Sequence, residues 1–366
     1  MLSDSKSMTN TFMRNSLNNS VYFILILVHF MVGCRKDPHH IELPIPVDSG
    51  CTESWCDEFP QSPELGWNYT SNGVQFLAPC FNPNNPDEFV YIKVFDGGQA
   101  QLIKHNIATK QETILLDPMS YGPPQWGSQG WITFVYTNKH IWKIRDDGTE
   151  LTQVTFGVDD KNPMFNYNGD KIIYYRNKYY TNFELSTNPD LYKDYKMMII
   201  DLNGQEVDSV MAAHVVPNNY YQNWSSAVAI SGEEIYFVGQ WDALHTGVYQ
   251  WDDVLDSVII ENTISLSNNT DGNTINDLSG SEEFIYFSKY RGGLYQIDTD
   301  TKNYIKIRWG CDTRYYDHLS MSSDGKSLIV QKVIQTPYDN NQSIDVQNEI
   351  WLIRIDSCAD ERILWE

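Results

Sequence analysis

The chain has few basic residues relative to its acidic ones. Its 26 lysines and arginines stand against 48 aspartates and glutamates, which gives a formal net charge of −22 at pH 7. A surface with this balance repels phosphate groups, so the charge argues against nucleic acid and anionic lipid headgroups as main partners. Acidic side chains also keep exported proteins soluble, and that general effect explains the charge without an acidic recognition surface.

The motifs of common catalytic and metal sites are also missing. The sequence has no Gly-x-Ser-x-Gly, which a serine hydrolase domain needs, and no His-Glu-x-x-His, Cys-x-x-Cys or phosphate-binding glycine loop. The segment 298–303 begins like a calcium loop, but its sixth position is Asn303 and its twelfth is Trp309, where such loops carry glycine and an acid. We therefore predict no cofactor, no metal and no enzyme of these classes.

No apolar run is long enough to cross a bilayer, which takes about 20 residues. The run 21–32 has 12 residues, a length that suits the core of a signal peptide. It ends in Met31-Val32-Gly33-Cys34, which resembles the bacterial lipobox. That resemblance implies removal of a signal peptide, 1–33, and attachment of lipid to Cys34. An uncleaved anchor and a plain secretory signal are the alternatives.

Residues 34–70 contain five prolines and little periodicity, so we interpret them as a flexible, lipid-bearing tether. Five cysteines remain after Cys34. Cys51 and Cys56 could close a small loop, and Cys311 and Cys358 could pair, as export permits. Five is an odd number, so at least one of these thiols, which include Cys80, stays unpaired or bonds elsewhere.

What the sequence does contain is a repeated strand signal. Six bursts of β-branched and aromatic residues each follow a short polar turn, at spacings of 42, 41, 63, 49 and 44 residues; they begin at Phe89, Trp131, Ile172, Ile235, Phe284 and Leu328. A second hairpin follows each burst, and such a repeat is typical of a four-stranded propeller blade. The repeat predicts an all-β, six-bladed β-propeller of four-stranded antiparallel blades over 71–366. A β-sandwich is the alternative.

The third and sixth copies of the repeat are the most specific. They read Asn162-Pro163-Met164-Phe165-Asn166-Tyr167-Asn168-Gly169 and Leu319-Ser320-Met321-Ser322-Ser323-Asp324-Gly325. The pattern resembles the TolB-type β-propeller, whose repeat runs Asn-Pro-x-Phe-Ser-Pro-Asp-Gly. Here Ser-Pro-Asp-Gly becomes Asn166-Tyr167-Asn168-Gly169 and Ser322-Ser323-Asp324-Gly325, so the turn chemistry is kept and the proline is absent. The resemblance implies a cell-envelope compartment and supports no particular role.

In a propeller, the loops that cross from one blade to the next surround one mouth of the central channel. The alignment of the repeats predicts that aromatic and polar residues gather there, which suits a peptide or a sugar. The predicted mouth residues are Tyr121, Asp160, Tyr221, Asn276, Arg314, Tyr316, Asp317 and His318. The alternative is that these side chains satisfy loop backbone and fill the channel.

The longest spacing contains an insertion between the third and fourth bursts. It is rich in tyrosine, and a second, polar insertion falls at the equivalent place in the sixth repeat. Equivalent insertions share one face of a propeller, often the binding face. The predicted interface residues are Tyr179, Tyr180, Tyr192 and Tyr195, unless the insertion packs on its own blade.

Taken together, the sequence predicts a non-catalytic, lipid-anchored cell-envelope protein, on the outer membrane rather than the inner one. Arg35 after the lipidated cysteine favours that membrane, because no acidic residue stands there. Its propeller would bind a protein, peptide or glycan. The alternative is a propeller enzyme, a glycan lyase or hydrolase, with its acid and base at the channel mouth.

Overall fold

The computed structural model describes residues 47–48, 68–71, 73–119, 122–156, 159–176, 196–211, 228–231, 234–242, 245–252, 257–268, 275–281, 283–289, 293–301, 303–311, 314–338 and 343–364. All of these belong to one compact unit, Leu43–Glu366. The predicted signal peptide and Cys34 lie outside the described residues. Within the described ranges, no helix has the length and apolar character that a membrane crossing requires.

The described strands pair into six sheets, each made of four strands consecutive in the chain and paired antiparallel. The first sheet contains β3 (Gln75–Asn82), β4 (Asn85–Val94), β5 (Ala100–Asn106) and β6 (Gln111–Leu116), and the second contains β7 (Gln125–Trp126), β8 (Trp131–Tyr136), β9 (His140–Arg145) and β10 (Thr152–Gln153). The third contains β11 (Asp160–Phe165), β12 (Lys171–Arg176), β13 (Lys196–Asp201) and β14 (Glu206–Met211), and the fourth β15 (Val228–Ser231), β16 (Glu234–Asp242), β17 (His245–Asp252) and β18 (Ser257–Asn268). The fifth contains β19 (Ile275–Gly280), β20 (Phe284–Lys289), β21 (Leu294–Asp298) and β22 (Tyr304–Arg308), and the sixth β23 (Arg314–Met321), β24 (Ser327–Tyr338), β25 (Ser343–Arg354) and β26 (Asp360–Leu364).

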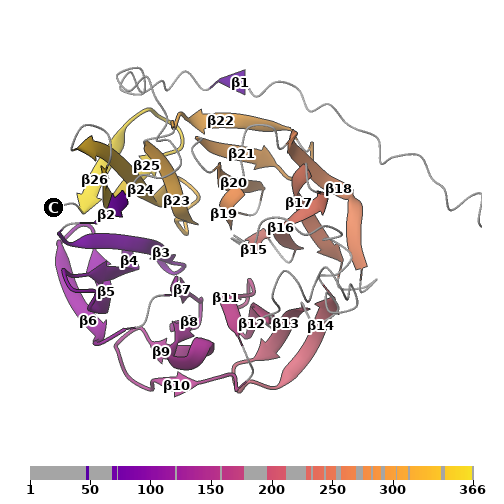
Figure 1. Cartoon of the computed structure of the whole chain (residues 1–366). Coiled ribbons are helices and arrows are strands. Elements are labelled where there is room, and N and C mark those ends of the chain that lie inside the picture. Colours follow the sequence, from indigo (N-terminus) through magenta and orange to yellow (C-terminus); the bar gives the residue numbers. More distant parts are fainter. Residues whose placement is uncertain are drawn as a thin grey trace, which may run out of the picture. The chain divides into compact units, whose positions relative to one another are not determined.

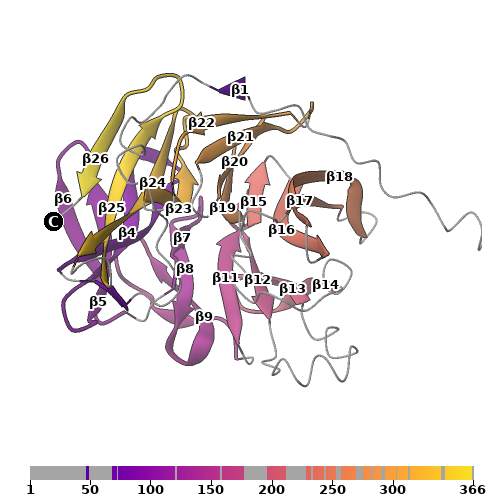
Figure 2. The ribbon, with the colours of Figure 1, turned by 45° about the horizontal axis from the view of Figure 1, so that its top comes forward.

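Each burst of the sequence repeat lies in the second strand of one sheet, in β4, β8, β12, β16, β20 and β24. The first strands of the sheets surround a common centre in Figure 1, and the tilted view of Figure 2 shows the sheets standing side by side around it. Contacts join β15, β19, β23, β3, β7 and β11 in that order. The predicted all-β propeller of four-stranded antiparallel blades is therefore confirmed.

The predicted tight turn of the third repeat is also confirmed. Gly169 has φ +70°, and its N–H donates to the carbonyl of Asn166 (2.9 Å). The Asn166 side chain accepts from the N–H groups of Asp170 (3.0 Å) and Lys171 (2.9 Å), so it fixes the turn from inside. A Cβ on Gly169 would lie 2.5 Å from Ser128 Oγ, so glycine is required both for the backbone angle and for the approach of the second sheet.

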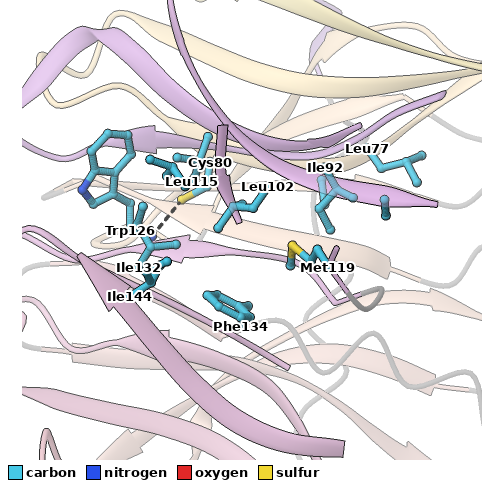
Figure 3. Packing of buried hydrophobic residues seen from close by; sticks show 13 residues of the cluster. Leu77, Cys80, Ile92, Leu102, Leu115, Met119, Trp126, Ile132, Phe134 and Ile144 are labelled. Carbon is cyan, nitrogen blue, oxygen red and sulfur yellow. Dashed lines mark hydrogen bonds between the residues drawn. The ribbon is translucent and has the colours of Figure 1, made fainter. Parts of the chain in front are cut away.

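Neighbouring sheets bury apolar side chains against each other. Figure 3 shows one such cluster between the first and second sheets; it includes Leu77, Ile92, Leu102, Met119, Trp126, Ile132, Phe134 and Ile144. Phe134 and Ile132 are fully buried. Burial of a side chain of this size contributes about 1.5–3 kcal/mol to folding. The junctions between sheets, rather than the hairpins alone, therefore hold the molecule together.

The same hydrogen bond recurs at three successive junctions between first strands. A short side chain near the end of one first strand accepts the backbone N–H of the next: Ser279 Oγ from Met321 (2.9 Å), Ser320 Oγ from Phe81 (3.0 Å) and Cys80 Sγ from Trp126 (3.3 Å). Figure 3 draws the third of these. The middle bond joins the last sheet to the first, across 239 positions of the chain.

A buried amide network reinforces that last junction. Gln331 Oε1 accepts the N–H of Ala78 (2.9 Å), and Gln331 Nε2 donates to Asn348 Oδ1 (2.8 Å). Asn348 in turn donates its Nδ2 to Gln75 Oε1 (2.8 Å). Each member has a partner, so the network contributes to the closure instead of costing desolvation energy.

A buried arginine joins the fifth and sixth sheets at their outer strands. The Arg308 side chain is almost completely buried, and its Nη2 donates a hydrogen bond to Asp360 Oδ1 (2.7 Å). The same Nη2 also donates to the backbone carbonyls of Arg354 (2.7 Å) and Ser357 (2.6 Å). These bonds satisfy the charge and hold the β25–β26 hairpin against β22. Only glycine fits at position 293, where the chain approaches Arg308, because a Cβ there would lie 1.9 Å from the Arg308 carbonyl oxygen.

Two short strands precede the first sheet. β1 (Val47–Asp48) pairs in parallel with β22, and β2 (Asn68–Thr70) pairs in parallel with β25. Both fall in the range 34–70 that the sequence assigns to the tether, so parts of that range belong to the folded unit. Strands of two or three residues carry no periodicity, and the sequence pattern therefore gives no sign of them.

The cysteines differ from one of the sequence expectations. Cys311 carries a thiol, whereas Cys358 is in a disulfide, so these two do not pair with each other. Cys80 is also a thiol, and burial raises its pKa to about 11. It acts as a hydrogen-bond acceptor between sheets and stays protonated at neutral pH.

Candidate functional site

Four of the first strands carry a bulge. The pairing register shifts between Leu77 and Cys80 in β3, between Lys161 and Met164 in β11, between Ile275 and Asp277 in β19, and between Asp317 and Leu319 in β23. Ala78, Asn162 and His318 have positive φ there. A bulge redirects a side chain away from the regular pleat, and bulges are frequent beside functional sites. The predicted Asn276 lies within the β19 bulge.

The β19 and β23 bulges bring two carboxylates and a histidine together. His318 Nδ1 lies 3.7 Å from Asp277 Oδ2, and the same oxygen accepts the N–H of Leu319 (2.9 Å). Asp317 Oδ1 accepts the N–H of His318 (3.0 Å). We name Asp277, Asp317 and His318 the bulge cluster. Its side chains are partly exposed, so the cluster is open to a ligand.

Burial and mutual charge set the protonation of the bulge cluster. Burial by itself would lower the pKa of His318, but the charges of Asp317 and Asp277 raise that pKa to about 9. Burial raises the pKa of Asp317, an effect that the neighbouring His318 charge opposes. At neutral pH the imidazole is therefore an imidazolium. Among the described residues no side chain bonds Asp317 Oδ2 or His318 Nε2, so the cluster retains one free acceptor atom and one free charged donor.

The predicted Asp160 is not a member of this cluster. It begins β11, is completely buried, and accepts a hydrogen bond from Arg176 Nε at its Oδ1 (2.8 Å). Arg176 Nη2 also donates to the Tyr174 hydroxyl (2.6 Å). Asp160 is thus held in a salt bridge within the third sheet. A buried carboxylate in this state serves the local structure and is poorly placed to exchange protons with a ligand.

Tyr316 and Arg314 both lie on β23 but differ in burial. The predicted Tyr316 is 1% exposed and packs among Tyr286, Leu319 and Val330 between the fifth and sixth sheets. A side chain that solvent does not reach offers no face to a partner. Arg314 begins the strand and is partly exposed.

A second charged group lies where the second and third sheets meet. The Asp159 carboxylate is near Lys139 Nζ through Oδ1 (3.4 Å) and near Lys161 Nζ through Oδ2 (3.7 Å). Lys139 ends the 3-10 helix η2 (Thr137–Lys139), which connects β8 to β9, and Asp159 directly precedes β11. We name these three residues the Asp159 cluster.

Several predicted residues lie outside the described ranges. They are Tyr121 and Tyr221 of the channel mouth and Tyr179, Tyr180, Tyr192 and Tyr195 of the insertion. Within the described part of the chain, no group of three or more histidine, cysteine, aspartate or glutamate side chains could hold a metal ion.

The sequence interpretation missed the acceptors that join the first strands. Ser279, Ser320 and Cys80 each stand two residues before the polar turn of their repeat. A short polar side chain at one position of a repeat is a recognisable signal once the repeats are aligned on their turns. The Asp159 cluster has no such signal, because Lys139 lies in an irregular turn of the neighbouring repeat.

Comparisons with known proteins show the fold. No family model matches the chain, and no curated protein matches its sequence. The β-propeller domain of the trilobed protease from Pyrococcus furiosus is 10% identical with a TM-score of 0.51, over 81% of this chain and 97% of that one. The acylaminoacyl peptidase of Pyrococcus horikoshii is 12% identical with a TM-score of 0.50, over 80% of this chain and 52% of the peptidase. TolB from Acinetobacter baumannii is 14% identical with a TM-score of 0.45, over 75% of this chain and 68% of TolB.

The similarities to the trilobed protease domain and to the acylaminoacyl peptidase agree with the sheet topology in defining the class of protein as a β-propeller. At such identities they show the fold alone, because unrelated functions share one fold. The chain spans about half the length of the acylaminoacyl peptidase that it resembles. Neither the binding nor the catalytic role of any of these proteins is thereby transferred to this chain.

Proposed function

We propose that this protein is a non-catalytic, lipid-anchored component of a bacterial cell envelope, whose propeller binds a protein, peptide or glycan at the channel mouth. In this proposal the six sheets act as six blades of one ring, closed between β11 and β15. The observation that carries the binding role is the bulge cluster, in which a histidine and two carboxylates gather while Asp317 Oδ2 and His318 Nε2 have no hydrogen-bond partner among the described residues. An acceptor next to a charged donor can orient an amide or a hydroxyl group.

The proposed contact surface includes the bulge cluster, Asn276 and Arg314. It also includes Tyr121 and Tyr221, together with the insertion tyrosines Tyr179, Tyr180, Tyr192 and Tyr195. Tyrosine is favoured in interfaces because it buries much area at little entropic cost. Tyr316 and Asp160 are left out, since the core and the Arg176 salt bridge occupy them.

Partner capture tests the binding role. The full chain is purified from detergent-solubilised envelopes, and quantitative mass spectrometry compares wild type with His318→Gln and Tyr179→Ala. A partner that wild type enriches should be lost from His318→Gln while that variant stays folded by circular dichroism. Asp324→Asn, in the turn at the other end of β23, is the matched control. Equal capture by all four proteins would exclude these residues from the contact.

Lipid attachment at Cys34 is tested separately. Cys34→Ser should move the protein from the membrane fraction to the soluble fraction, because two or more acyl chains are needed for stable anchoring. Separation of inner and outer membranes on a density gradient then places the wild-type protein. A Cys34→Ser protein that stays in the membrane fraction would contradict the lipoprotein proposal.

The raised pKa of Asp317 is compatible with the alternative function, a glycan lyase or hydrolase. A carboxyl group whose pKa is raised by burial, next to a histidine, can serve as an acid in glycan cleavage. Incubation with cell-wall glycans and measurement of new reducing ends or unsaturated products tests this role. Activity that Asp317→Asn abolishes would replace the binding proposal.

A further inference from the structure

The Asp159 carboxylate lacks hydrogen bonds although it is buried. Its side chain is 9% exposed, and neither oxygen has a hydrogen-bond donor in the described structure. Its two lysine contacts, at 3.4 and 3.7 Å, are ion pairs without hydrogen-bond geometry. Buried carboxylates in native structures almost always have donors. This one therefore has two acceptor sites that a bound group could use.

The two lysines stand at the outer side of the carboxylate. The side chain of Lys139 is 60% exposed and that of Lys161 is 39% exposed. An exposed lysine side chain changes rotamer within nanoseconds, so the path to Asp159 opens without a change of fold. Each ammonium carries three N–H donors, so it can donate a hydrogen bond to an oxygen of a bound ligand in addition to its other partners.

The arrangement is close to symmetric. Oδ1 faces the ammonium of Lys139, and Oδ2 faces the ammonium of Lys161. A group that fits between them must donate to each oxygen and accept from each lysine. A hydroxyl does both at once, whereas an ammonium cannot accept and a carboxylate cannot donate. Two hydroxyls on adjacent carbons present this pattern in duplicate, at a separation similar to that of the two carboxylate oxygens.

We propose that the Asp159 cluster is a carbohydrate subsite that binds a vicinal diol of a neutral sugar. Each hydroxyl donates to one oxygen of Asp159 and accepts from Lys139 or Lys161. Asp159 lies in the loop that crosses to the third sheet, on the same mouth as the other crossing loops. The inference rests on the proposed binding function, and it names the glycan as the ligand at this end of the mouth.

Sugar binding to the full chain tests the subsite. Methyl α-mannopyranoside and methyl β-glucopyranoside, which differ in diol geometry, are titrated by saturation-transfer NMR, with their permethylated forms as probes without O–H donors. At least one diol sugar should bind and its permethylated form should not. Asp159→Asn should weaken binding about tenfold or more, because a carboxamide offers one acceptor oxygen in place of two. Glu150→Gln, which alters an exposed ion pair at the far end of β9, is the matched control and should bind as wild type does.

Lys139→Met provides a second variant should Asp159→Asn fold poorly, since its exposed side chain tolerates substitution. It should also weaken binding. The inference is overturned if wild type binds neither sugar, if a permethylated form binds equally well, or if both variants bind like wild type. Peptide capture through His318 together with absent sugar binding would overturn this subsite alone and leave the proposed function standing.

Discussion

At the scale of single residues, His318 shows how a fold gives an ordinary side chain an unusual charge state. Its positive φ of 36° places it in the β23 bulge, where Asp277 and Asp317 face it from two first strands. Those two carboxylates raise its pKa to about 9, against the lowering effect of burial. The histidine is therefore a fixed cation between two sheets at neutral pH.

This charge makes stability depend on pH in a defined direction. A folded-state pKa raised from 6.5 to about 9 contributes stability that is complete below pH 6.5 and is lost as the pH rises through about 9. The free energy of unfolding of wild type should therefore fall over this window. His318→Gln should show a smaller fall, measured by urea denaturation at successive pH values. Parallel pH curves for the two proteins would mean that His318 is not held charged.

At the scale of elements, the first strands are joined by one type of bond used repeatedly. Ser279, Ser320 and Cys80 each accept an N–H from the next first strand, so a bond from backbone to side chain fixes the spacing between these sheets. Ser320 is the most consequential, because it joins the last sheet to the first. The short strand β2, which precedes the first sheet, also pairs with β25 of the sixth sheet, so the Ser320 bond adds to a backbone link between those two sheets.

Loss of the Ser320 hydroxyl should therefore weaken the closure. In Ser320→Ala the N–H of the buried Phe81 loses its acceptor, which costs about 1–3 kcal/mol. Chemical denaturation should show a lower midpoint. Ser323→Ala, exposed in the following turn, is the control and should leave the midpoint within error. A Ser320→Ala midpoint equal to that of wild type would show that the amide network of Gln331 is sufficient for closure.

At the scale of the whole molecule, the net charge of −22 dominates. The local pairs of Asp160 with Arg176 and of Arg308 with Asp360 use few of the acidic groups. The remaining carboxylates repel one another and oppose the compact state. The same negative charge opposes the approach of polyanions to the protein.

Salt should therefore stabilise this protein. The Debye length falls from about 20 Å to about 6 Å between roughly 20 and 300 mM sodium chloride, so repulsion between surface carboxylates is screened. The melting temperature should rise over this range, and potassium chloride should act equally. A melting temperature that falls with salt would mean that surface ion pairs outweigh the excess negative charge.

The sequence by itself determined the repeat and hence the class of fold. Period-two alternation and Asn-Gly or Asp-Gly turns are local properties, because strand burial and turn backbone angles depend on neighbours within a few positions. The six bursts therefore marked the second strand of each sheet. The alignment of the repeats likewise predicts that Asp317 and His318 lie at the channel mouth.

Only the tertiary structure decided which of the predicted mouth residues are exposed and which are buried or held in a salt bridge. Tyr316 is one residue from Asp317, yet it is buried against the fifth sheet, because alternate residues of a strand face opposite sides. Asp160 is occupied by Arg176 from the adjacent strand, whereas Asp159 next to it faces two lysines from two sheets. Parallel strands β1 and β2 likewise depend on edges formed by residues more than 200 positions away. Such pairings are set by packing across the molecule, and no local pattern in the chain encodes them.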